Sequence, residues 1–123
     1  MTNEAKGTSI RKVWVPTEMK TAIETLCWQK RTRPSPFIVS IIEGFLADPD
    51  AYRGAEIPPA GRDYVSLYID DSVWREATDT ADSMGTRLSA VVRVGVARVL
   101  AEEGIPLEVH AARPRHERIP LSA

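Results

Sequence analysis

The sequence predicts a mainly α-helical protein with a two-stranded antiparallel β-ribbon, built from two copies of one strand-helix-helix unit. Three observations predict this fold class. A shift of 54 positions aligns residues 10–46 with residues 64–100 without a gap. Each aligned segment begins with apolar residues at every second position, which is typical of a strand with one buried face. Two stretches of helical periodicity then follow in both segments, so the same small unit occurs twice.

The repeat is clearest at one turn, where Thr32-Arg33-Pro34-Ser35 aligns with Thr86-Arg87-Leu88-Ser89. Between the copies, residues 48–62 contain three prolines, two glycines and no apolar periodicity, which is typical of a linker. The chain is therefore expected to have five parts. These are a flexible N-terminal arm (1–9), a first copy (10–47), a linker (48–62), a second copy (63–104) and an irregular C-terminal tail (105–123).

The strands are expected at residues 10–15 and 64–69. Pro16 ends the first strand because proline has no N–H to donate to a ladder. The run Asp70-Asp71-Ser72 ends the second strand by offering side-chain oxygens to the N–H groups of a following helix. The buried faces of the two strands are expected to consist of Val13, Val15, Val65, Leu67 and Ile69.

Two helices are expected after each strand. The first carries one apolar stripe in each copy, and Gly85 supplies a helix end in the second copy. The second helix is expected to begin with a hydroxyl cap, from Thr32 or Ser35 and from Thr86 or Ser89. Because this second helix is the more apolar of the two, we expect it at the centre of the fold.

Pairing between the copies is required for a stable fold. One unit alone has a single short strand with unpaired backbone groups on both edges, and its two helices cannot cover their own apolar faces. Antiparallel pairing of the two strands satisfies the ladder and lets four helices close one core. The linker is long enough for this pairing to occur within one chain, as an intramolecular pseudo-dimer.

Composition and charge limit the classes of function that this chain can have. The net charge is −1, so any anion binding depends on local placement of cations. The single Cys27 cannot form an intramolecular disulfide, and the polar N-terminal run does not resemble a secretory leader, so a cytoplasmic location is expected. The longest uncharged, mostly apolar run, Pro34 to Ile42, is too short to span a membrane. With His110 and His116 both in the tail and no phosphate-binding glycine motif, we expect no metal, no cofactor and no enzyme activity.

The segment Val13-Trp14-Val15-Pro16-Thr17-Glu18-Met19, and the turn from Thr86 to Ser89 with Val91-Val92 after it, resemble the ribbon-helix-helix family of DNA-binding proteins. The two copies in fixed register are similar to the tandem members of that family. The resemblance implies double-stranded DNA as partner. It also implies a role as repressor, antitoxin or accessory factor of a plasmid or other mobile genetic element.

A two-stranded ribbon fits the major groove of B-DNA and directs every second side chain at base edges. We expect the base-contacting side chains to be Lys12, Trp14, Ser66 and Tyr68, with Ile10 and Tyr64 near the ribbon ends. The free N–H groups at the start of each second helix are expected to bind phosphate. The residues flanking these helix starts are Thr32, Arg33, Ser35, Thr86, Arg87 and Ser89.

The charges predict that the two copies bind DNA unequally, because residues 10–46 carry a net charge of +3 and residues 64–100 a net charge of −1. A transcriptional regulator with an asymmetric site is the first hypothesis, with further assembly of pseudo-dimers along DNA left open. The alternative is a protein-interaction adaptor, antitoxin-like or host-directed, in which the ribbon face or the tail from Ile105 onward holds a protein partner. In that case Trp14 and Tyr68 belong to a protein interface, and the threonines act only as helix caps.

Overall fold

The structure, a computed structural model, describes residues 7–105, 107 and 117–122. It confirms the predicted fold class of four helices with two-stranded antiparallel sheets, arranged as two paired β-α-α units. The first unit consists of β1 (Thr8–Val15), α1 (Thr17–Lys30) and α2 (Pro34–Ala47). The second consists of β3 (Asp63–Asp70), α3 (Asp71–Ser83) and α4 (Leu88–Glu102). The remaining elements are the 3-10 helix η1 (Pro49–Tyr52) and the short strands β2 (Glu56–Ile57) and β4 (Glu117–Arg118).

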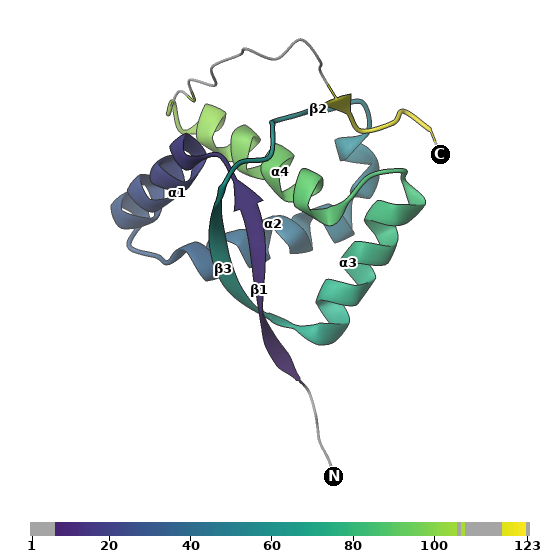
Figure 1. The fold of residues 1–123 in the computed structure, drawn as a ribbon, viewed down its shortest axis with the longest axis horizontal. Helices are drawn as coiled ribbons and strands as arrows, with labels where there is room; N and C mark the ends of the chain where they lie inside the picture. Colours follow the sequence, from purple (N-terminus) through teal and green to yellow (C-terminus); the bar gives the residue numbers. More distant parts are fainter. Residues whose placement is uncertain (1–6, 106, 108–116, 123) are drawn as a thin grey trace.

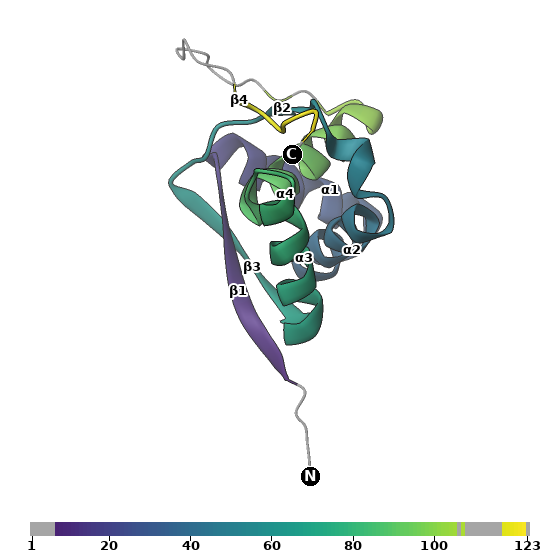
Figure 2. The same cartoon turned by 90° about the vertical axis from the view of Figure 1, so that its right-hand side faces the viewer.

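The strands β1 and β3 pair antiparallel and form a ribbon on one side of the four helices (Figures 1 and 2). Lys12 lies directly opposite Ser66 in this ladder, and Val13 lies opposite Val65. Lys12 and Ser66 are also equivalent residues under the 54-position shift. The ribbon therefore has a local two-fold axis through this pair, as a pseudo-dimer with equivalent contacts on both sides requires.

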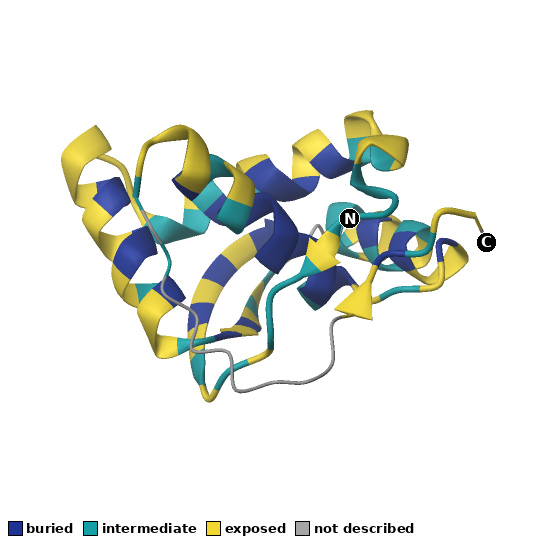
Figure 3. Ribbon diagram, turned by 90° about the horizontal axis from the view of Figure 1, so that it is seen from above, coloured by how far each residue is buried: buried dark blue, intermediate teal, exposed yellow. Residues whose placement is uncertain are grey.

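One face of the ribbon is buried and the other is exposed, as the period-two pattern predicts. Figure 3 shows this alternation as dark blue and yellow bands along the strands. The five strand residues expected on the buried face all lie in the hydrophobic core. Residues 90–96 of α4 are buried without interruption, so α4 occupies the centre as expected from its apolar sequence.

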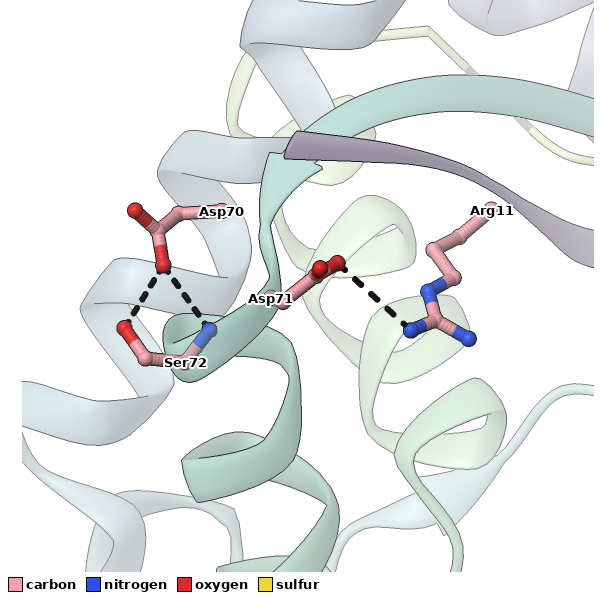
Figure 4. A network of polar contacts seen from close by, with 4 residues as sticks. All are labelled: Arg11, Asp70, Asp71 and Ser72. Atoms are coloured by element: carbon pink, nitrogen blue, oxygen red, sulfur yellow. Dashed lines mark hydrogen bonds and ion pairs between the residues drawn. The ribbon is translucent and has the colours of Figure 1, made fainter. Parts of the chain in front are cut away.

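The prediction of hydroxyl caps on the second helices is wrong. The N-cap residues are Arg33 in α2 and Arg87 in α4, both extended, and neither side chain makes a capping hydrogen bond. In α2 the cause is Pro34, because the residue before a proline is driven out of the α region. By contrast, Asp70 caps α3 as predicted, accepting a hydrogen bond from the Ser72 N–H at 2.8 Å (Figure 4).

The linker and the end of the chain are joined. β2 in the linker pairs antiparallel with β4, and the Ile119 side chain is fully buried in the core. Backbone hydrogen bonds connect Ile119 to Gly54 and to Ala55 at 2.7 and 2.9 Å. We expected an irregular tail from residue 105, and this part of it is ordered because Ile119 completes the core beside α4. The segment that contains His110 and His116 lies outside the described residues.

A buried cation fixes the linker to the first strand. Arg93 of α4 is only 7% exposed, and its guanidinium donates hydrogen bonds to the backbone oxygens of Pro58 at 2.8 Å and Trp14 at 3.3 Å. Burial lowers the pKa of Arg93, and the carboxylate of Glu117 partly offsets this. The repeat-equivalent position in α2 is Val39, so this connection exists in one copy alone. Within the described ranges, no helix has the length and apolar character needed to cross a bilayer.

Candidate nucleic-acid interface

The outer face of the ribbon presents the six side chains predicted to contact bases, and all six are exposed. The ladder arranges them as three cross-strand pairs. Lys12 and Ser66 form the central pair on the local two-fold axis. The two outer pairs are Ile10 with Tyr68 at one end and Trp14 with Tyr64 at the other.

The Trp14–Tyr64 end of the ribbon is held by ring contacts. The two rings meet edge to face with centroids 5.2 Å apart. The Lys12 ammonium lies 4.5 Å from the centroid of the Tyr64 ring, and the Lys20 ammonium lies 5.6 Å from it. A cation at this distance is attracted by the ring quadrupole. Lys12 is therefore drawn from the two-fold axis toward this end.

Each end of the ribbon is also closed by an ion pair, and the two pairs have opposite polarity. At one end Lys20 of α1 pairs with Asp63 of β3 at 3.3 Å, so the helix supplies the cation. At the other end Arg11 of β1 pairs with Asp71 of α3 at 3.7 Å, so the strand supplies it (Figure 4). The Lys20 hydrogen bond is the main cause that lowers the pKa of Asp63, followed by the Tyr64 backbone N–H. In both ion pairs the first copy supplies the cation and the second copy supplies the carboxylate, so the pairs favour contact between the two different copies.

The start of α2 is tied to the ribbon. The Tyr68 N–H, on the edge of β3 that faces away from β1, donates to the Ser35 hydroxyl oxygen at 2.8 Å. The hydroxyl of Ser35 keeps its own hydrogen to donate outward. Thr32 and Thr86 each precede an N-cap arginine by one residue, and Arg33 and Arg87 are both exposed.

The two second helices differ in their free N–H groups. In α4 the first intrahelical bond runs from Val91 to Arg87, which leaves three preceding N–H groups, those of Leu88, Ser89 and Ala90. In α2 the first bond runs from Phe37 to Arg33, but two of the three preceding residues are prolines. Ser35 alone supplies a free N–H there. The backbone at the start of α4 therefore offers an anion more hydrogen-bond donors than the backbone at the start of α2. Any anion binding at the start of α2 depends more on side-chain cations.

Sequence reasoning did not single out Lys20, which lies beside several of the predicted contact residues. A hollow of about 310 Å³ lies beside β3, and Lys20 lines it together with Arg33, Ser35, Tyr64 and Ser66. The hollow therefore brings side chains predicted to contact bases and side chains predicted to contact phosphates together with Lys20. Lys20 lies in the first turn of the helix that follows β1, where a long cationic side chain can reach back to the end of the ribbon. The sequence alone does not show that its partner is Asp63.

No group of three potential metal ligands occurs among the residues that the structure describes. Cys27 is buried, and this burial raises the pKa of its thiol, so it behaves as a small core residue. The ribbon face and the start of α2 form one connected polar and aromatic surface, joined by the Tyr68–Ser35 hydrogen bond and by the hollow beside β3.

Comparison with known proteins gives one family match. Residues 62–121 match the family model of the RelB antitoxins, which are a ribbon-helix-helix family and are non-enzymatic. The matched range holds β3, α3 and α4, and it extends through β4. No curated protein and no solved structure matches the chain significantly.

Proposed function

We propose that this chain is an antitoxin-type DNA-binding regulator that inserts its ribbon into the major groove as a single-chain pseudo-dimer. RelB-like antitoxins bind DNA and regulate their own transcription, and they also bind a toxin. The observation that carries the proposal is the outer face of the ribbon, where three cross-strand pairs stand exposed beside the start of α2. A ribbon of this kind is a known reader of the major groove.

The central pair supplies the hydrogen bonds of this proposal. The Lys12 ammonium donates to O6 or N7 of guanine, and the Ser66 hydroxyl bonds to several bases. The two outer pairs flank this centre and contact neighbouring base pairs through Ile10 and Tyr68 at one end and Trp14 and Tyr64 at the other. Because the two strands carry different side chains at equivalent positions, we expect an asymmetric operator.

Phosphates are held on both sides of the groove. The free N–H groups and the dipole at the start of each second helix attract a phosphate, and Arg33 and Arg87 add charge there. Ser35, Ser89, Thr32 and Thr86 supply neutral donors around these groups. Such contacts fix the register of the protein on the duplex without reading sequence.

The decisive experiment selects bound fragments from genomic DNA, maps the site by footprinting and titrates binding at two salt concentrations. We expect an asymmetric footprint and an affinity that falls steeply as salt rises, because phosphate neutralisation releases counterions. Binding that does not respond to salt, or a footprint on a perfect inverted repeat, contradicts the proposal. Neighbouring genes then distinguish an antitoxin from another repressor or a mobile-element factor.

A second function, binding of a protein toxin, is favoured by the family match. RelB antitoxins bind their cognate toxin as well as operator DNA, and the matched range reaches residue 121. We propose that the second copy and the tail from Ile105 onward carry this interaction, in the cytoplasm. Co-expression with the reading frame adjacent to its gene tests it: a neutralised toxin that copurifies with the chain supports the proposal, and unrelieved growth arrest contradicts it.

A further inference from the structure

We infer that the ribbon recognises thymine methyl groups on both sides of a hydrogen-bonded centre, so that the operator carries thymines at both ends of the contacted segment. This inference rests on the proposed DNA binding and names the sequence class that the ribbon selects. Its basis is the division of the outer face: hydrogen-bonding side chains at the central pair, large apolar side chains at both outer pairs.

The apolar character of the ribbon ends is unusual for an exposed surface. Six large hydrophobic side chains are exposed among the described residues, and four of them lie on this one face. Ile10, Trp14, Tyr64 and Tyr68 are 58%, 45%, 36% and 63% exposed. Apolar side chains gathered on one face mark a surface that a partner covers.

The partner surface must therefore be apolar at two places and polar between them. In the major groove of unmodified DNA, the apolar group that distinguishes one base pair from another is the C5 methyl of thymine. Every base pair exposes three hydrogen-bonding groups at its major-groove edge, but only an A·T or T·A pair adds a methyl group that an apolar side chain can bury. An A·T or T·A pair places a methyl against the rings or the Ile10 side chain.

The two ends differ in how rigidly they are held. Trp14 and Tyr64 are fixed by their edge-to-face contact, and Lys12 lies over the Tyr64 ring. Ile10 and Tyr68 are the more exposed pair. A contact surface that is already ordered loses less entropy on binding. The methyl requirement is therefore stronger at the Trp14 end.

The test uses duplexes selected from a random pool by the full chain. The selected sequence is rebuilt with deoxyuridine in place of each thymine in turn, which removes the methyl and keeps every hydrogen-bonding group. We expect affinity to fall about threefold to tenfold for a methyl that meets the ribbon, on the scale of one buried methyl group. Thymines outside the ribbon contact should tolerate the exchange.

Matched variants assign the effect to each end. Trp14→Ser should abolish the preference for thymine over uracil at one end, and Ile10→Ser should abolish it at the other. Both positions are exposed, so the fold should persist, and circular dichroism verifies this. Arg87→Ala serves as the control, because loss of a phosphate contact weakens the thymine and uracil duplexes equally.

The outcomes separate this inference from the function on which it rests. Equal, salt-dependent affinity for thymine and uracil duplexes overturns the methyl readout and leaves DNA binding intact. A methyl effect that survives both Trp14→Ser and Ile10→Ser also overturns it. Absence of binding to any duplex overturns the inference together with the proposed function.

Discussion

Gly95 of α4 lies against Ile41 of α2 so closely that a Cβ atom on Gly95 would come within 2.4 Å of the Ile41 Cγ2 atom. Gly95 and Ile41 are equivalent residues under the 54-position shift. The two second helices therefore cross on the local two-fold axis with a large residue on one side and no side chain on the other. Two first copies would place isoleucine against isoleucine there, and two second copies would leave a void.

This contact makes Gly95→Ala destabilising. The added methyl has no room, so we expect the free energy of unfolding to fall by about 1–3 kcal/mol, as is typical of overpacking. Gly44 of α2 is the matched control, because a Cβ there meets nothing within 4 Å. Gly44→Ala should stabilise the protein by up to about 1 kcal/mol through helix propensity. Urea unfolding of both variants measures the difference, and equal effects would contradict the close contact.

Replacement of Arg93 tests the bond between α4 and the linker. Arg93→Met fills similar volume but leaves the backbone oxygens of Pro58 and Trp14 without this donor. We expect the free energy of unfolding to fall by about 1–3 kcal/mol in total, because two part-buried acceptors lose a charged donor. Val39→Met, at the equivalent position of α2, should cost less. Limited proteolysis should cut the linker faster in Arg93→Met, and unchanged cleavage would argue against the clamp.

Because the starts of α2 and α4 differ in their number of free N–H groups, we expect Arg33 and Arg87 to contribute unequally to DNA affinity. Removal of either Arg33 or Arg87 should lower the slope of log affinity against log salt by about 0.9, as expected for one phosphate contact. We expect Arg33→Ala to weaken binding about tenfold and Arg87→Ala about threefold, because α4 retains three free N–H groups and α2 retains one. Arg98, more than two turns along α4, is the control cation. The opposite ranking would contradict the role of Pro34 and Pro36.

Acid should weaken the fold through Asp63. Its pKa lies below the usual 3.8 because Lys20 hydrogen-bonds to the carboxylate. As the pH falls, the Asp63 carboxylate of the folded state therefore becomes protonated at a lower pH than that of the unfolded state. The stabilisation is present above pH 3.8 and is lost as the pH falls through the folded pKa. Asp63→Asn should flatten the fall of the urea midpoint below about pH 4. Lys20→Met should do the same, and the double variant should add nothing further.

The ribbon and its outward face could be predicted because they depend on local patterns. Period-two alternation places Val13 and Lys12 on opposite faces, and the repeat itself fixes the register, since equivalent strands must meet on a two-fold axis. The six exposed ribbon residues follow from these two facts. The cap on α3 was also predictable, because Asp70 acts within two residues of its own position.

The remaining features depend on contacts between distant residues. The pairing of β2 with β4 joins two-residue strands that have no periodicity of their own, and burial of Ile119 decides it. Gly95 has the appearance of an ordinary helical glycine until Ile41 is placed against it. In α2 the hydroxyl cap failed because Pro34 acts on its neighbour Arg33 through steric exclusion, which the preference for serine and threonine does not include. α4 has an arginine N-cap as well, although it begins with Leu88 and not with a proline.

The pairing of β1 with β3 inside one chain also determines how the protein behaves when it is scarce. A homodimeric reader dissociates on dilution, and its occupancy of a site falls faster than the number of molecules. Here the second half is always present at the effective concentration set by its tether, on the order of millimolar for a short connection. A single molecule per cell would thus carry the complete ribbon, and the number of complete ribbons would rise linearly with copy number.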